Sequence, residues 1–146
     1  MSEFSTVGSD RQNGFPAENL HRVMYVEDNP ANLKLVDMIL QRRGDIRLLP
    51  ACSAEIGLAL LRNQQADLIL MDIHLPGMDG YEMLKQLQLD EQTRNIPVVA
   101  VSANALPQDV EKGLEAGFID YLTKPIRVSD LLRILDRLLL SQSPQS

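Results

Sequence analysis

Five side chains that could do chemistry follow, or end, apolar runs that could be buried strands. They are Glu27, Asp28, Asp72, Ser102 and Lys124. Three carboxylates in one crevice repel one another unless a cation lies between them. Mg²⁺ takes oxygen ligands, commonly one or two carboxylates with water and a phosphate, and a hydroxyl and an ammonium suit the remaining phosphate oxygens. Since an aspartate can be the nucleophile that receives a phosphoryl group, the set indicates Mg²⁺-dependent phosphorylation of a carboxylate.

These groups can converge only if the strands that carry them lie side by side. The apolar runs predict five strands, at residues 22–26, 46–50, 67–71, 96–102 and 118–122. Most are continuous in Val, Ile and Leu, which is typical of a parallel sheet buried on both faces. Right-handed crossovers then place helices on both sides of the sheet. We therefore expect an α/β fold, an open doubly wound sandwich of five β–α units that binds ligands beyond the carboxyl ends of its strands.

Capping residues place the five helices. Asn29 and Pro30 start the first helix and Gly44 follows its end, while Ser53 caps the second, which runs to about Asn63. The third is expected from Gly80 to about Leu89 with Asp79 as its cap, the fourth around Leu106, Val110 and Leu114 until Gly117, and the fifth from Val128 to about Leu140.

The fifth helix carries a broad apolar stripe. Its members are Val128, Leu131, Leu132, Ile134, Leu135, Leu138 and Leu139. From Ile134 to Leu132 the stripe spans about 160° of a helical wheel, whereas one core contact needs about 100°. Two interpretations follow: the helix is well buried, or the edge of the stripe near Ile134 contacts a partner.

Composition bounds the class of protein. The 146 residues suggest one domain, expected at 21–140 between a flexible N-terminal lead or linker at 1–20 and a disordered tail at 141–146. A net charge of −6 without a basic cluster argues against direct nucleic-acid binding. No apolar run approaches the roughly 18–20 residues that span a bilayer, and the N-terminus lacks a secretory signal. Cys52 alone permits no intrachain disulfide and is expected to be buried or half-buried. A cytoplasmic domain is expected.

Four motifs connect this pattern to a known family. VEDNPANLKLV (26–36), MDIHLPGMDG (71–80), VSANA (101–105) and YLTKPI (121–126) occur in the order and spacing of the receiver domains of two-component signalling. The chain resembles such a CheY-like response regulator domain over roughly residues 21–140. The resemblance implies a flavodoxin-like (βα)5 fold whose five-stranded parallel sheet has the order 2-1-3-4-5.

The resemblance also implies an acceptor and a metal site. Asp72 accepts a phosphoryl group from the phosphohistidine of a histidine kinase or histidine phosphotransfer protein. Asp28 binds Mg²⁺ directly and Glu27 binds it directly or through water, with the His74 backbone carbonyl as a further ligand. Glu27 stands where the family often has Asp, which lengthens its reach by one methylene. The side chains of His74 and Asn104 are candidates for tuning the phosphoryl lifetime through water access.

Further roles concern the switch that phosphorylation operates. Lys124 pairs with the phosphoryl group and with Asp72, and the Lys124–Pro125 bond is expected to be cis. Ser102 hydrogen-bonds a phosphoryl oxygen, and Tyr121 is the aromatic residue that rotates inward when Ser102 moves. The face formed by the fourth helix, fifth strand and fifth helix then binds a downstream protein effector or forms a homodimer.

Simpler interpretations and other classes compete with this one. Taken singly, Asp72 could cap a turn, Glu27 and Asp28 could stabilise a helix start, and Lys124 could be a surface lysine. A non-phosphorylated interaction module with the same fold would not bind Mg²⁺. A phosphatase with an aspartate nucleophile would place a second Asp where this chain has His74, and would carry a cap insertion. We expect no enzyme acting on a separate substrate, but a single-domain regulator or the receiver of a longer protein such as a hybrid kinase.

Overall fold

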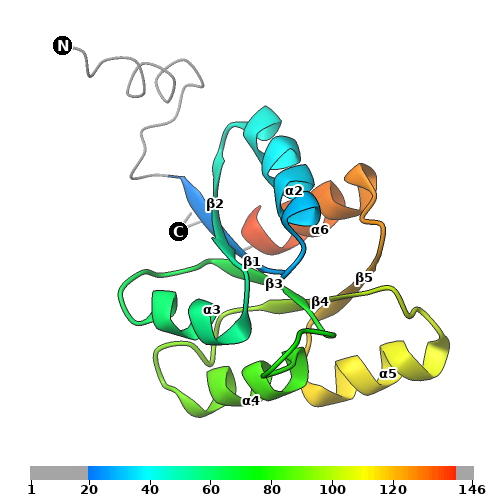
Figure 1. The fold of residues 1–146 in the computed structure, drawn as a ribbon. Coiled ribbons are helices and arrows are strands. Elements are labelled where there is room, and N and C mark those ends of the chain that lie inside the picture. The colour runs from blue at the N-terminus through cyan, green and yellow to red at the C-terminus, as the bar shows by residue number, and fades with distance from the viewer. Residues whose placement is uncertain (1–19, 141–146) are drawn as a thin grey trace.

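Strands and helices alternate along the whole of the described chain. The structure is a computed structural model that describes residues 20–140. Its elements are β1 (His21–Val26), α2 (Pro30–Arg43), β2 (Ile46–Ala51), α3 (Ala54–Leu61), β3 (Leu68–Asp72), α4 (Gly80–Leu89), β4 (Val98–Ser102), α5 (Pro107–Ala116), β5 (Asp120–Thr123) and α6 (Val128–Leu140) (Figure 1). The predictions for the lead, apart from Leu20, and for the tail at 141–146 lie outside the described residues.

The five strands form one parallel sheet of the order β2-β1-β3-β4-β5, which confirms the predicted fold class and topology. The register aligns the carboxyl ends of neighbouring strands: Asp72 pairs with Val101, and Ser102 pairs with Thr123. The residues that follow β1, β3, β4 and β5 therefore meet at one edge of the sheet.

Two apolar layers hold the sheet between helices. Along β1, Val23 and Tyr25 face the side covered by α2 and α6, whereas Met24 and Val26 face the side of α3 and α4 (Figure 1). Because successive side chains of a strand point to opposite faces, each residue of this strand contributes to one layer. Both faces are buried, as the continuous apolar runs predicted.

The predicted caps are present. Asn29 Oδ1 accepts a hydrogen bond of 2.9 Å from the Ala31 amide. Gly44 ends α2 with a φ of 86°, a left-handed conformation that glycine adopts without a Cβ clash. Asp79 caps α4 in a reciprocal capping box with Glu82. Asp79 thus has a structural role, as expected.

Two strands, the fourth and the fifth, start two residues later than predicted. The fourth strand begins at Val98 rather than at residue 96, since Pro97 has no N–H with which to join the ladder. The fifth begins at Asp120 rather than at residue 118, because the Phe118 amide still donates to Gly113 O in the last turn of α5. The shift shortens β5 but leaves Lys124 beyond its end.

Two predictions of burial need correction. Ile134 is only 2% exposed, so the interpretation that its edge of α6 contacts a partner is wrong, and the exposed end of the stripe is Val128 at 51%. Cys52 is exposed rather than buried, because it lies in the turn after β2. No burial was predicted for Leu106 and Leu114, the leucines that mark α5, and both are exposed because this helix presents Gly113 to the interior.

None of the helices in the described part of the chain is both long enough and apolar enough to cross a lipid bilayer.

Candidate functional site

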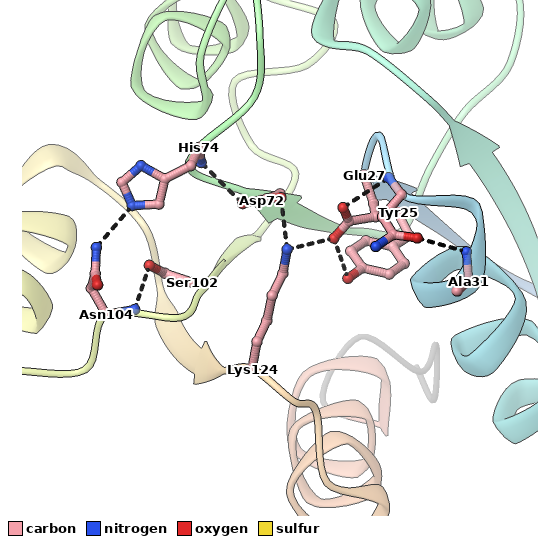
Figure 2. A network of polar contacts seen from close by, with 9 residues as sticks. Tyr25, Glu27, Ala31, Asp72, His74, Ser102, Asn104 and Lys124 are labelled. Atoms are coloured by element: carbon pink, nitrogen blue, oxygen red, sulfur yellow. Dashed lines mark hydrogen bonds and ion pairs between the residues drawn. The ribbon is translucent and has the colours of Figure 1, made fainter.

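The site is centred on Asp72, the last residue of β3. Its carboxylate is almost fully buried, with the residue 3% exposed. Oδ1 accepts a hydrogen bond of 2.9 Å from the His74 amide, and Oδ2 lies 2.8 Å from Lys124 Nζ (Figure 2). The acid thus retains two strong partners at the rim of the sheet, which compensate in part for the loss of water.

Glu27, one residue beyond β1, is the second buried acid. It is 1% exposed, and its Oε1 lies 2.8 Å from Lys124 Nζ and accepts a hydrogen bond of 2.9 Å from the Tyr25 hydroxyl. Its Oε2 accepts a hydrogen bond of 3.0 Å from the Asn29 amide. Lys124 therefore bridges two buried carboxylates that come from different strands (Figure 2).

The pKa values of the two buried acids are shifted in opposite directions because their hydrogen-bond partners differ. Burial raises the pKa of Asp72 above its usual value, the negative charge of Glu27 adds to this, and the bonds from Lys124 and the His74 amide only partly offset it. Burial alone would also raise the pKa of Glu27, but the hydrogen bonds from Lys124, Asn29 and Tyr25 hold it below its usual value. Of the two buried acids, Asp72 is therefore the one whose charge is less well compensated.

Burial shifts the pKa of the lysine in the opposite direction to the pKa of the two acids. Burial by itself lowers the pKa of Lys124, but the hydrogen bonds to Asp72 and Glu27 raise it overall. Lys124 is therefore an ammonium throughout the neutral range, and it balances one of the negative charges around it.

A divalent cation fits the remaining charge. Ligand oxygens of Glu27, Asp28 and Asp72 all lie within 4.8 Å of one another, and Asp28 is exposed at the mouth of the site. Three carboxylates against the one ammonium of Lys124 leave two negative charges. All three ligands are carboxylates, the hard oxygen donors that suit Mg²⁺ rather than a soft metal.

The strand next to Asp72 contributes a hydroxyl. Ser102, which ends β4, is fully buried, and its Oγ accepts a hydrogen bond of 3.0 Å from the Asn104 amide. The Lys124 amide donates to the Ser102 carbonyl over 2.9 Å, which ties the residue after β5 to the end of β4. The Lys124–Pro125 bond is cis.

Two exposed side chains meet across the mouth of the site. The Asn104 side-chain amide lies 3.2 Å from His74 Nε2, a contact between the loops that follow β4 and β3 (Figure 2). With the amide as donor, Nε2 accepts and the ring proton lies on Nδ1. The pair covers the same edge of the sheet at which Asp72 is buried.

Tyr121, on β5, is half-buried and points toward the loop after β4. Its hydroxyl donates a hydrogen bond of 2.7 Å to the Asn104 carbonyl. A Cβ on Gly113 would lie 3.2 Å from the Tyr121 ring, which is a tight contact. The ring can pack closely against α5 because residue 113 is a glycine. The aromatic side chain thus links α5 to the loop that also carries the His74 contact.

The sequence did not predict the roles of two residues at or near the site. Tyr25 reads as an apolar residue of a buried strand, and only its spacing of two from Glu27 places both on one face. Glu55, on α3, accepts a hydrogen bond of 3.2 Å from the Met78 amide and so supports the loop after His74. No sequence pattern marks that contact, since 23 residues separate the partners.

A family model and individual relatives place the chain in the same protein family. The family described as the response regulator receiver domain matches residues 23–136. The chain is 42% identical over 106 residues to the polar-differentiation response regulator DivK of Brucella ovis, a match that covers 73% of this chain and 85% of DivK. It is 34% identical over 117 residues to the sensor histidine kinase GacS of Pseudomonas protegens, covering 78% of this chain but 13% of that kinase.

A solved structure of a related domain has the same fold. The receiver domain of the sensor histidine kinase PA1611 from Pseudomonas aeruginosa PAO1 superimposes with a TM-score of 0.75 at 36% identity. The match covers 82% of this chain and 98% of that domain, which has a magnesium ion coordinated in its active-site cleft.

Proposed function

Because this chain belongs to the family of response regulator receiver domains, we propose that it is a signalling switch phosphorylated on Asp72. The proposal rests on the set of charged groups around the Asp72 carboxylate. Asp72 is buried at the end of its strand, held by one ammonium and flanked by two further acids. A carboxylate in that position is a nucleophile whose charge is balanced once a divalent cation is bound.

Mg²⁺ is the cofactor that we infer. Glu27, Asp28 and Asp72 would hold it, with the His74 carbonyl as a further ligand, and the related PA1611 domain has magnesium in its active-site cleft. Bound there, the ion supplies positive charge to oxygens of the incoming phosphoryl group. The two uncompensated negative charges of the site are the reason why the metal is required.

Phosphoryl transfer follows from the positions of the side chains. A carboxylate oxygen of Asp72 forms a bond to phosphorus while the phosphorus–nitrogen bond of a donor phosphohistidine breaks, and the electron pair leaves on the imidazole nitrogen. The Lys124 ammonium, now on Asp72, moves its hydrogen bond to a phosphoryl oxygen, and the Ser102 hydroxyl donates to another. The product is an aspartyl phosphate and a free histidine on the donor, which is a histidine kinase or a histidine phosphotransfer protein.

The response to phosphorylation passes through the neighbouring loop. Ser102 Oγ now accepts from the Asn104 amide, so turning toward the phosphoryl group removes that acceptor and moves the loop to which Tyr121 is bonded. The face formed by α5, β5 and α6 exposes Leu106, Leu114 and Ile119. This face is where we place the contact with a downstream effector or a second copy of the chain. The domain, spanning 21–140, acts in the cytoplasm on no separate substrate.

A labelling experiment tests the proposal. The wild-type protein, incubated with acetyl phosphate and Mg²⁺, should gain one phosphoryl group per chain that is lost on treatment with hydroxylamine. Asp72→Asn should gain none. Asp37→Asn is the matched control, because Asp37 is a half-buried residue of α2 whose side chain accepts a hydrogen bond from Gln41, and it is not part of the acidic cluster. Equal labelling of Asp72→Asn and the wild type would exclude Asp72 as the acceptor.

A further inference from the structure

Tyr25 buries a hydroxyl beneath the acidic site. The residue is fully buried on β1, and its ring lies in the apolar layer under α2 and α6. The hydroxyl emerges from this layer toward Glu27 and donates a hydrogen bond of 2.9 Å to Oε1 (Figure 2). Tyr25 and Glu27 point to the same side because they are two residues apart, and Glu27 directly follows the strand that carries Tyr25.

The apolar layer alone does not explain a tyrosine at this position. A phenylalanine ring would fill the same space, and burying a hydroxyl costs free energy unless it finds a hydrogen-bond partner. The partner given by the structure is Glu27, a residue of the site and not of the core. The role of the Tyr25 hydroxyl is therefore to bond the Glu27 carboxylate.

The contact determines how Glu27 is oriented. Oε1 is shared by the Tyr25 hydroxyl and the Lys124 ammonium, and Oε2 accepts from the Asn29 amide. Donors on both oxygens restrict the rotation of the carboxylate. Without the hydroxyl, Oε1 would keep only the flexible lysine, and Glu27 could turn with it. The carboxylate oxygens of Glu27 would then no longer be held facing the space that they share with the oxygens of Asp28 and Asp72, where the metal would bind.

From this arrangement we propose that Tyr25 is a positioning residue that holds the Glu27 carboxylate in the orientation required for Mg²⁺. The inference rests on the proposed function, because Glu27 matters to the metal only if the cluster binds one. Partners that orient a metal ligand from behind typically contribute about 10–100-fold in metal affinity. Tyr25 touches neither the phosphoryl group nor the metal, so its effect must pass through Glu27.

The test is a double-mutant cycle measured by calorimetric titration with Mg²⁺. Tyr25→Phe should weaken Mg²⁺ binding by about ten-fold. In a Glu27→Asp background the shorter acid no longer reaches the hydroxyl, so the same change should have less than about a two-fold effect. Tyr81→Phe, on α4, is the matched control and should leave the affinity unchanged. An equal loss in both backgrounds, or no loss in either, overturns the inference.

A second measurement needs no variant. In the wild-type protein the Tyr25 hydroxyl proton should give a slowly exchanging nuclear magnetic resonance signal with a cross-peak to Glu27, and both should persist when Mg²⁺ is added. Loss of the cross-peak on metal binding would mean that Glu27 leaves Tyr25 to reach the metal, which contradicts the role proposed. If the wild type itself binds no Mg²⁺, the proposed function fails and not the contact between Tyr25 and Glu27.

Discussion

Lys124 Nζ and Asp72 Oδ2 lie 2.8 Å apart, although Lys124 follows β5, Asp72 ends β3, and β4 separates these two strands in the sheet. The lysine reaches across the end of β4 and continues to Glu27 Oε1, also at 2.8 Å. One ammonium thus spans the site from β5 to β1. This geometry keeps two buried acids close together in the absence of a phosphoryl group, and it leads to the predictions that follow.

Replacing Lys124 by methionine should destabilise the metal-free protein. Glu27 and Asp72 would then face each other without a cation. We expect a loss of about 2 kcal/mol in the free energy of unfolding, less than the roughly 3–5 kcal/mol for a fully buried pair because the lysine side chain is 22% exposed. Urea unfolding with and without Mg²⁺ measures this, and the metal should restore most of the loss. Lys112→Met, on the surface of α5, is the control. Unchanged stability of Lys124→Met would contradict the bridging role.

Asp72→Asn should stabilise the metal-free protein near neutral pH. The pKa of Asp72 is raised by burial, so its ionised form is less favourable in the folded than in the unfolded chain. As the pH falls through the raised pKa toward the usual 3.8, the folded carboxyl takes up its proton first and this cost disappears. The difference in unfolding free energy between variant and wild type should therefore shrink between neutral and acidic pH. A variant that is less stable than the wild type near neutral pH, with a deficit that disappears on acidification, would show that the pKa of Asp72 is lowered instead.

Asn104→Ala should shorten the life of the aspartyl phosphate. The change removes the 3.2 Å contact with His74 and opens the mouth of the site to water. A contact worth about 1 kcal/mol corresponds to roughly a five-fold faster hydrolysis. The rate is measured as loss of label after the phosphodonor is removed, with Asn63→Ala in the turn after α3 as control. If His74→Ala and Asn104→Ala act through one contact, the double variant should hydrolyse no faster than either alone. Fully additive rates would count against that contact.

Gly113→Ala should disturb Tyr121. The added Cβ would lie 3.2 Å from the tyrosine ring. We expect a loss of about 1 kcal/mol in unfolding free energy from overpacking. In a Tyr121→Ala background the ring is gone, and the same change should instead stabilise α5 by about 1 kcal/mol through helix propensity. Thermal unfolding of the four proteins gives the comparison. A loss of the same size in both backgrounds would mean that Gly113 is required for a reason other than the ring.

Much of the fold could be predicted from local patterns. Asn29, Gly44 and Asp79 act through their own backbone neighbours, so their capping roles follow from the sequence. The strand bounds were harder to place, because the Phe118 amide bonds back to the last turn of α5 instead of joining the ladder. The strand order came from the resemblance to a family and not from the hydrophobic pattern, since spacing alone does not say which strands pair.

The site was predictable where chemistry follows position along the chain. Glu27, Asp72 and Lys124 follow or end their strands, and parallel strands bring such residues to one edge. Burial was less predictable, because it depends on elements far away in the sequence. Ile134 is covered within the core, Cys52 is not covered, and the role of Tyr25 depends on the direction of one hydroxyl.

Identification of the phosphorylated residue tests the central claim most directly. The protein is phosphorylated with acetyl phosphate and Mg²⁺, reduced with borohydride, and digested for peptide sequencing by mass spectrometry. Borohydride converts an aspartyl phosphate to homoserine, so the modification marks the acceptor. We predict homoserine at position 72 and unmodified aspartate at position 79 of the same peptide. Homoserine at another position, with Asp72 intact, would contradict the account.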